Sequence, residues 1–208
     1  MKALIPSLAL AMLVTAACSS GGSSGAVDSS PTASGYGDDF AARWWQWTES
    51  IPPEANPVDD RSGASCAENQ PKDVWFLTGT YGGSASRSCS LPPRVPIFFP
   101  VLNQVCTVVG DESSDQALRR CTTEADVARA TLDGTQLKVQ SRTSRGVFEL
   151  TSSPGSHTGF GPGTHRAVAW GLWVGPLPLS PGTHTLHFIG RAGSFTTDVT
   201  YRLNVSAH

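Results

Sequence analysis

Hydrophobic and polar residues alternate one by one near the C-terminal end of the chain. Apolar side chains and one threonine occupy every second position from Phe195 to Val205, and the positions between them are polar. A period of two is typical of a β-strand with one buried face and one solvent face. In the preceding segment, 183–190, the inward positions are His184, Leu186 and Phe188. The pattern predicts two antiparallel strands joined by a glycine-containing turn.

Shorter apolar segments bounded by glycine and proline predict further strands. These segments are 73–79, 86–91, 95–102, 146–151 and 167–175. Residues 130–139 predict a hairpin, because Asp133-Gly134 suits the type I′ turn that joins two strands closely. Many short strands with few helices favour a mainly β domain. The specific expectation is an antiparallel β-sandwich, Ig-like or jelly-roll-like, with one or two decorating helices.

A helical period appears in residues 38–50. Phe40, Trp44 and Trp47 fall on one stripe, which we expect to face the core. Asp38 or Asp39 can cap the helix, and the prolines after Ile51 end it. Trp45 lies off the stripe, so it either packs elsewhere or forms an aromatic platform for a ligand. A second helix is expected within residues 113–129.

The N-terminal segment has the features of an export signal. Lys2 precedes an apolar run, 3–14, which is too short to cross a bilayer core of about 30 Å. Small residues then lead to Cys18 and a serine- and glycine-rich tract, an arrangement that resembles a bacterial lipoprotein signal. The resemblance implies cleavage before Cys18 and acylation of that cysteine. Ordinary signal peptidase cleavage stays open, because Thr15 and Ala17 suit that enzyme as well.

This interpretation divides the chain into three parts: a signal peptide at 1–17, a lipidated Ser/Gly-rich tether at 18–37, and a single β-rich domain at 38–208. The protein is then expected in the bacterial cell envelope, anchored to a membrane through its lipid and facing the extracytoplasmic side. Ser19 after the cysteine favours the outer membrane in a cell that has one. The expected partners are the membrane and a glycan or envelope protein.

Charge is sparse and nearly balanced along the chain. Asp, Glu, Lys and Arg make up 15% of the residues, and the formal net charge is -2, which argues against a nucleic-acid partner. The sequence contains no phosphate-binding loop, dinucleotide fingerprint or haem motif, so no cofactor is expected. His184 and His187 project to opposite faces of a predicted strand and cannot chelate together there, and we expect no metal site.

The sequence has five cysteines, and the lipoprotein interpretation assigns Cys18 to the lipid. An even number then remains in an exported chain, which indicates two disulfides. These cysteines are Cys66, Cys89, Cys106 and Cys121. Three pairings are possible. Short sequence separation favours Cys66 with Cys89 and Cys106 with Cys121, and the absence of a C-x-x-C pair argues against zinc.

Two strings of residues resemble a group of exported bacterial proteins. The first comprises Trp44-Trp45-x-Trp47, Asn56-Pro57, Cys66, Val74-Trp75-Phe76-Leu77-x-Gly79, Arg87-x-Cys89, Phe98-Phe99-Pro100 and Asn103-x-x-Cys106. The second comprises Pro181-Gly182-x-His184-Thr185-Leu186-His187-Phe188 and Asp198-Val199-Thr200-Tyr201. The resemblance covers most of the mature chain and implies export and a shared fold, without an activity. The connection 151–165 is shorter than in that group, so no site on that loop is carried over.

The first functional hypothesis is a non-catalytic binding module for a glycan, an envelope polymer or a partner protein. Its candidate binding residues are Trp45, Trp75 and Trp173, because aromatic rings stack on sugar faces and suit a weakly charged surface. Trp170 belongs to the apolar set of its predicted strand. Trp173 is therefore expected to be the exposed member.

The alternative hypothesis is a hydrolase that acts on envelope or extracellular material through paired carboxylates. The catalytic candidates are Asp59, Asp60 and Asp73, near Glu54 and Glu68, although aspartates in such a loop more often form turns and caps. This hypothesis requires the carboxylates to converge with an arginine or a histidine in one cleft. A purely structural envelope role is the third hypothesis.

Overall fold

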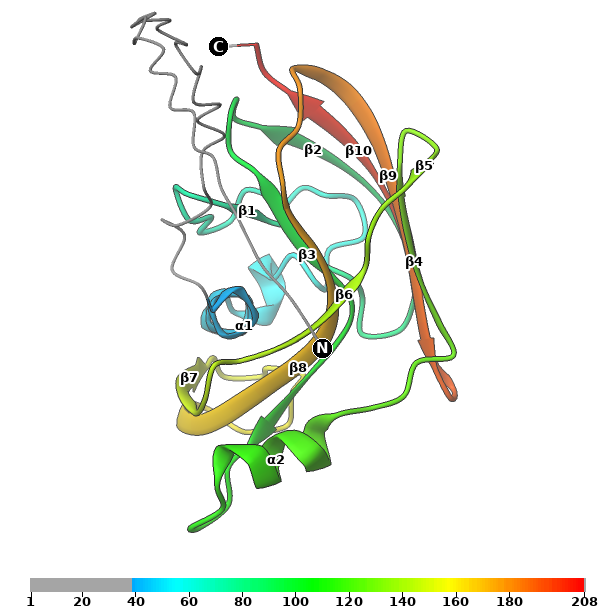
Figure 1. The fold of residues 1–208 in the computed structure, drawn as a ribbon. Coiled ribbons are helices and arrows are strands. Elements are labelled where there is room, and N and C mark those ends of the chain that lie inside the picture. Colours follow the sequence, from blue (N-terminus) through cyan, green and yellow to red (C-terminus); the bar gives the residue numbers. More distant parts are fainter. Residues whose placement is uncertain (1–38, 208) are drawn as a thin grey trace, which may run out of the picture. The chain divides into compact units, whose positions relative to one another are not determined.

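The computed structural model describes residues 39–207. The expected signal peptide and tether, including Cys18, lie outside the described residues. The described part is mainly β, with two α-helices and two five-stranded sheets (Figure 1). The helical elements are α1 (Phe40–Ser50), a 3-10 turn (Pro53–Ala55) and α2 (Ser114–Cys121). The strands are β1 (Trp75–Phe76), β2 (Gly83–Leu91), β3 (Ile97–Thr107), β4 (Val127–Leu132), β5 (Thr135–Gln136), β6 (Gln140–Thr143), β7 (Phe148–Ser152), β8 (Gly163–Leu177), β9 (Gly182–Ala192) and β10 (Phe195–Val205).

One sheet, called sheet A, is organised around the long strand β8. Its order is β1-β3-β8-β6, and β7 pairs with β8 beyond the end of β6. β3 runs antiparallel to β8, with irregularities in register after Ile97 and after Pro100. The hydrophobic pattern does not predict β6, because its four residues are all polar. Only the register with β8 makes this segment a strand.

The second sheet, called sheet B, has the order β2-β10-β9-β4-β5. The predicted C-terminal hairpin is confirmed, since β9 and β10 pair antiparallel along their whole length. The inward positions of β10 are buried as the alternation predicts, with Val199, Tyr201 and Leu203 at most 1% exposed. The mainly β class with few helices is likewise confirmed.

The direction of two strands corrects the expectation of purely antiparallel sheets. β2 runs parallel to β10, and β1 runs parallel to β3, so both sheets are mixed. After β2 the chain passes into sheet A as β3 and returns to the hairpin of β9 and β10 much later. This route sets the direction of β2 relative to β10, and no local sequence pattern encodes it.

The two sheets pack face to face, with the main hydrophobic core between them. Phe99 from β3 stacks on Phe188 from β9, with ring centroids 5.0 Å apart. Gly190 marks a close approach of the sheets, because a Cβ there would lie 2.1 Å from the carbonyl oxygen of Val101. Any side chain at Gly190 would therefore force the sheets apart.

Helix α1 covers the other face of sheet A, so the domain has three layers (Figure 1). Asp39 caps the helix by accepting a hydrogen bond from the backbone N–H of Ala42. The predicted stripe is buried: Phe40 stacks on Phe98 at 5.0 Å, and the indole N–H groups of Trp44 and Trp47 donate to backbone carbonyls at 2.9 Å. Their carbonyl partners belong to Leu77 and Glu68.

The second helix is shorter than the sequence suggests. α2 begins after Ser113, whose side chain forms a capping box with Gln116, and it ends at Cys121. Residues 127–132 form β4 instead of an extension of the helix, because they pair antiparallel with β9 in sheet B. The predicted hairpin follows, and Asp133 and Gly134 both have the positive φ values that a type I′ turn requires.

Two disulfides join Cys66 to Cys89 and Cys106 to Cys121, as short sequence separation favours. The first ties the loop before β1 to sheet B, and the second ties α2 to β3. Such bonds are typical of an oxidising, extracytoplasmic location. Within residues 39–207, no helix has the length and apolar character needed to span a membrane.

Candidate functional site

All three predicted binding tryptophans are buried, including Trp45, which is 6% exposed and belongs to the cluster between α1 and sheet A. Trp173 is 0% exposed and lies between α1 and sheet A, stacked on Phe98 with a centroid separation of 5.1 Å. Trp75 is 8% exposed and packs in the core between the sheets. The expectation that Trp173 is exposed is therefore wrong. That expectation assumed that one face of β8 is exposed to solvent, whereas α1 covers this face.

Each acidic candidate for catalysis has its own partner. Asp73 forms an ion pair with Arg43 at 2.6 Å, and this hydrogen bond lowers the pKa of Asp73. Asp60 accepts hydrogen bonds from its own loop, the backbone N–H of Ser65 among them. Burial acts to raise the pKa of Asp60, but these hydrogen bonds lower it overall. Asp59 contacts Nε2 of His157 at 3.0 Å. Each of the three carboxylates is therefore held by a different group.

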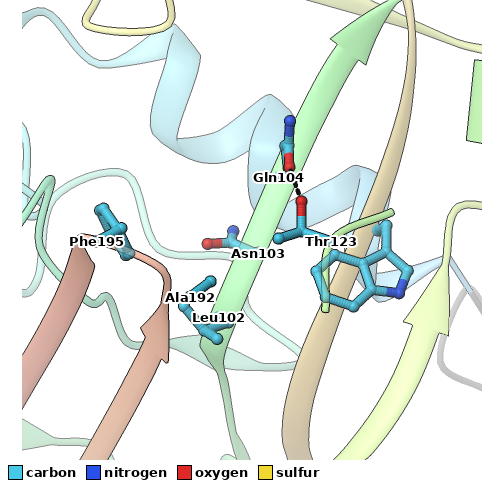
Figure 2. Close-up of a pocket in the computed structure, with 7 residues that line it drawn as sticks. Leu102, Asn103, Gln104, Thr123, Ala192 and Phe195 are labelled. Atoms are coloured by element: carbon cyan, nitrogen blue, oxygen red, sulfur yellow. Dashed lines mark hydrogen bonds between the residues drawn. The ribbon is translucent and has the colours of Figure 1, made fainter. Parts of the chain in front are cut away.

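One hollow of the described surface lies beside the turn between β9 and β10 (Figure 2). Its volume is about 270 Å³, close to the lower limit of small-ligand pockets, roughly 300 Å³. The apolar part of its wall comes from Leu102, Trp170, Ala192 and Phe195. The polar part comes from Asn103, Gln104 and Thr123.

A second, smaller hollow of about 120 Å³ adjoins the first. Asn103 and Phe195 line both hollows, and we call the two hollows together the Phe195 cleft. The other walls of the smaller hollow are Trp44 and Trp45 from α1, Val58, and the segment 79–81 after β1. Of the predicted binding residues, Trp45 alone lines the cleft.

The fold explains why an aromatic ring is available at this position. Phe195 is the first residue of β10 and continues the inward row that buries Val199 and Tyr201. At Phe195 the row runs past the edge of the core, and this side chain is 40% exposed. Figure 2 shows Phe195 on one side of Asn103 and Thr123 on the other. A hydrophobic residue beside the turn of a hairpin was the one sequence signal for this position.

The cleft contains hydrogen-bond donors that lack partners. The side-chain nitrogens of Asn103 and Trp45 are buried, and neither finds a partner among residues 39–207. Leaving a buried donor unpaired costs about 1 to 3 kcal/mol, so each such group requires an explanation. The indole N–H groups of Trp75 and Trp173 are also unpaired, but these residues line neither hollow.

Tyr81 adds a further donor at the rim of the smaller hollow. Its hydroxyl forms no hydrogen bond with any of the described residues, and its ring contacts the ring of His157 at 4.7 Å. Burial, together with the negative charges of Glu49 and Asp59, raises the pKa of Tyr81. The hydroxyl therefore keeps its proton and remains a donor at any physiological pH.

The described residues that line the Phe195 cleft are all uncharged. They comprise aromatic rings, small apolar side chains, amides and hydroxyls. Within residues 39–207, no group of three or more His, Cys, Asp or Glu side chains is arranged to hold a metal ion. The cleft can contact the apolar face of a neutral ligand and donate hydrogen bonds to its oxygens.

Comparisons with known proteins leave the family of this chain open. No family model matches it, and no curated protein matches it. Among solved structures, one titled "Solution Structure of Amebosin" aligns with 63% of this chain and 96% of that chain, at 11% sequence identity and a TM-score of 0.24. A TM-score this low supports no inference about function.

Proposed function

We propose that this protein is an envelope-anchored lipoprotein whose β-domain binds an uncharged glycan in the Phe195 cleft without catalysing a reaction. The observation that carries the proposal is the buried, unpaired amide nitrogen of Asn103 in a cleft lined by aromatic rings and without charged side chains. A sugar would supply both the hydrogen-bond acceptors and the apolar faces that such a cleft can bind. Its oxygens accept hydrogen bonds, and its C–H faces stack on aromatic rings.

The cleft supports a neutral ligand more strongly than a charged one. A charged group that entered it would leave water without meeting an opposite charge among the described lining residues. Hydrogen bonds to a buried, unpaired donor are especially favourable, because the free protein already bears the cost of the missing partner. Asn103 offers such a bond to a sugar oxygen, and the exposed Tyr81 offers an additional hydroxyl donor.

The hydrolase alternative has less support. It requires the acidic loop to converge on one cleft, but Asp59, Asp60 and Asp73 line neither hollow and each has a separate partner. A structural role without a ligand is the alternative if no glycan binds. The location forms part of the proposal: the lipoprotein-type signal at Cys18 and the resemblance to exported bacterial proteins support it, together with the two disulfides.

The test is glycan-array screening of the soluble domain, residues 38–208, followed by calorimetric titration of the glycans found. Phe195→Ala and Asn103→Ala should each weaken binding about fivefold to tenfold, the size expected for losing one aromatic contact or one hydrogen bond. Val109→Ala is the matched control, because Val109 is 66% exposed and lies outside the cleft. The proposal fails if the wild-type domain binds no glycan, or if all three variants bind as the wild type does.

A further inference from the structure

We infer that the glycan bound in the Phe195 cleft carries acetamido groups, and that the larger hollow is the subsite for one of them. This inference rests on the proposed glycan binding and names the class of sugar. The observation that supports this inference is that apolar and polar groups line the same small hollow. Apolar walls at Leu102 and Ala192 meet an unpaired buried donor at Asn103 and a hydroxyl at Thr123 (Figure 2).

An acetamido group has three parts, and the larger hollow offers a place for each. Its methyl group is apolar and can contact Leu102 and Ala192. Its carbonyl oxygen can accept a hydrogen bond from the side-chain nitrogen of Asn103. Its amide N–H needs an acceptor, which Thr123 supplies: the Thr123 hydroxyl donates its own proton to Oε1 of Gln104 at 2.8 Å, so the lone pairs of its oxygen remain available.

Asn103 can reach a ligand at little cost. Its side-chain nitrogen is buried in the free protein, although the residue as a whole is half-buried. The terminal torsion of asparagine has a broad, shallow energy profile, so the amide can rotate to present its donor to the hollow. Because the nitrogen has no partner among the described residues, this rotation breaks no hydrogen bond within residues 39–207.

Other common sugar substituents fit this hollow less well. A hydroxyl group in place of the acetamido group would lose water against apolar walls and would leave the space for the methyl group unfilled. A carboxylate or an ammonium group would find no opposite charge among the described lining residues. The combination of a methyl group, one acceptor and one donor matches the wall most closely.

The smaller hollow extends the site to a neighbouring sugar. Asn103 and Phe195 line both hollows, so a ligand that fills the larger one directs its next residue toward Tyr81. The Tyr81 hydroxyl is a permanent donor with no hydrogen-bond partner among the described residues, and it can bind a sugar oxygen there. The expected ligand is therefore an oligosaccharide and not a single sugar.

The test compares two neutral trisaccharides with the same β-1,4 linkage. Chitotriose carries an acetamido group at C2 of every sugar, whereas cellotriose carries a hydroxyl there. We expect the soluble domain to bind chitotriose roughly twentyfold more tightly, which corresponds to burying one methyl group and forming one hydrogen bond. Isothermal titration calorimetry of both ligands measures the ratio directly.

Variants then assign the preference to the hollow. Asn103→Leu and Thr123→Val should each reduce the preference for chitotriose to about fourfold, because each removes one polar contact to the acetamido group. Val109→Ala should retain the wild-type ratio. Near-UV circular dichroism of each variant checks that the fold is intact, and Thr123, on an exposed loop, provides a test that does not depend on substitution within β3.

The outcomes separate this inference from the proposed function. If chitotriose binds tightly and the variants lose the preference, both statements stand. If the two trisaccharides bind in the cleft equally tightly, or cellotriose binds more tightly, glycan binding stands and the acetamido assignment is wrong. If the array and both titrations show no binding, both are wrong. A preference for chitotriose that survives Asn103→Leu and Thr123→Val overturns the assignment to this hollow.

Discussion

Arg87 donates a hydrogen bond to the hydroxyl of Tyr201 at 2.7 Å, between two residues that lie opposite each other in the parallel pairing of β2 with β10. Arg87 is 3% exposed and has no carboxylate partner among the described residues. Its guanidinium instead donates to the backbone carbonyls of Thr78, Val58 and Asp60. A buried cation thus holds the loops that precede β1 and follow it against sheet B.

Replacing Arg87 should strongly destabilise the domain. Arg87→Met leaves three buried or half-buried carbonyl oxygens and the Tyr201 hydroxyl without this donor, and should lower the free energy of unfolding by about 3 to 5 kcal/mol. Tyr201→Phe should cost about 1 to 3 kcal/mol. Urea denaturation measures both changes. Arg202→Met, at an exposed position of β10, is the control and should change stability by less than about 0.5 kcal/mol.

Trp44 and Trp45 should differ in their tolerance of phenylalanine. Trp44→Phe removes an N–H that donates to Leu77, whereas Trp45→Phe removes a donor without a partner among the described residues. Trp45→Phe should therefore cost about 1 to 3 kcal/mol less than Trp44→Phe. Both alanine variants should cost about 3 to 5 kcal/mol, because both side chains are buried. Equal stabilities of the two phenylalanine variants would contradict this account.

The two disulfides should contribute comparably to stability. They close segments with sequence separations of 23 and 15 residues, for which the chain-entropy model gives about 3 kcal/mol each. Reducing both should lower the melting temperature by roughly ten degrees or more. Differential scanning calorimetry with and without a reductant measures the change. Mass mapping that finds four free thiols in the purified protein would refute the pairing itself.

Stability should decrease as the pH rises above about 6.5. Hydrogen bonds to Asp133, at 2.7 Å, and to the backbone of Ser180 raise the pKa of His184 above its value of 6.5. A raised pKa in the folded state means that this contribution is complete below pH 6.5 and is lost as the pH passes the folded-state value. His184→Gln should destabilise the protein more at pH 6 than at pH 8.5.

The control for this pH effect is Val109→Ala, because Val109 is exposed and has no titratable group. Its effect on the free energy of unfolding should be the same at both pH values. Chemical denaturation of the two variants and the wild type at pH 6 and pH 8.5 provides the comparison. A pH-independent effect of His184→Gln would show that the ion pair with Asp133 does not form.

The lipid anchor is tested at Cys18. Cys18→Ala should move the protein from the membrane pellet to the soluble or precursor fraction, because the acyl chains would be attached to that sulfur and to the new N-terminus. Fractionation followed by mass spectrometry of the mature N-terminus measures this. Unchanged fractionation without lipid mass on the wild-type protein would favour ordinary signal peptidase cleavage.

The sequence by itself determined the features that depend on neighbouring residues. Alternation of residues identified β9 and β10, because side chains on a strand point to opposite faces with a period of two. The stripe of Phe40, Trp44 and Trp47 identified α1 by the same kind of local geometry. The turn at Asp133-Gly134 and the disulfide pairing also followed from short separations along the chain.

Only the tertiary structure decided which surfaces are covered and which residues meet. Trp173 alternates with apolar neighbours as a half-exposed strand residue would, yet α1 packs over it and buries it. The direction of β2 depends on how the chain passes between the sheets, which no local pattern records. The Phe195 cleft combines Trp45, Tyr81, Asn103 and Phe195 from distant parts of the chain, and their proximity arises because sheet packing and α1 docking bring three layers together at one end.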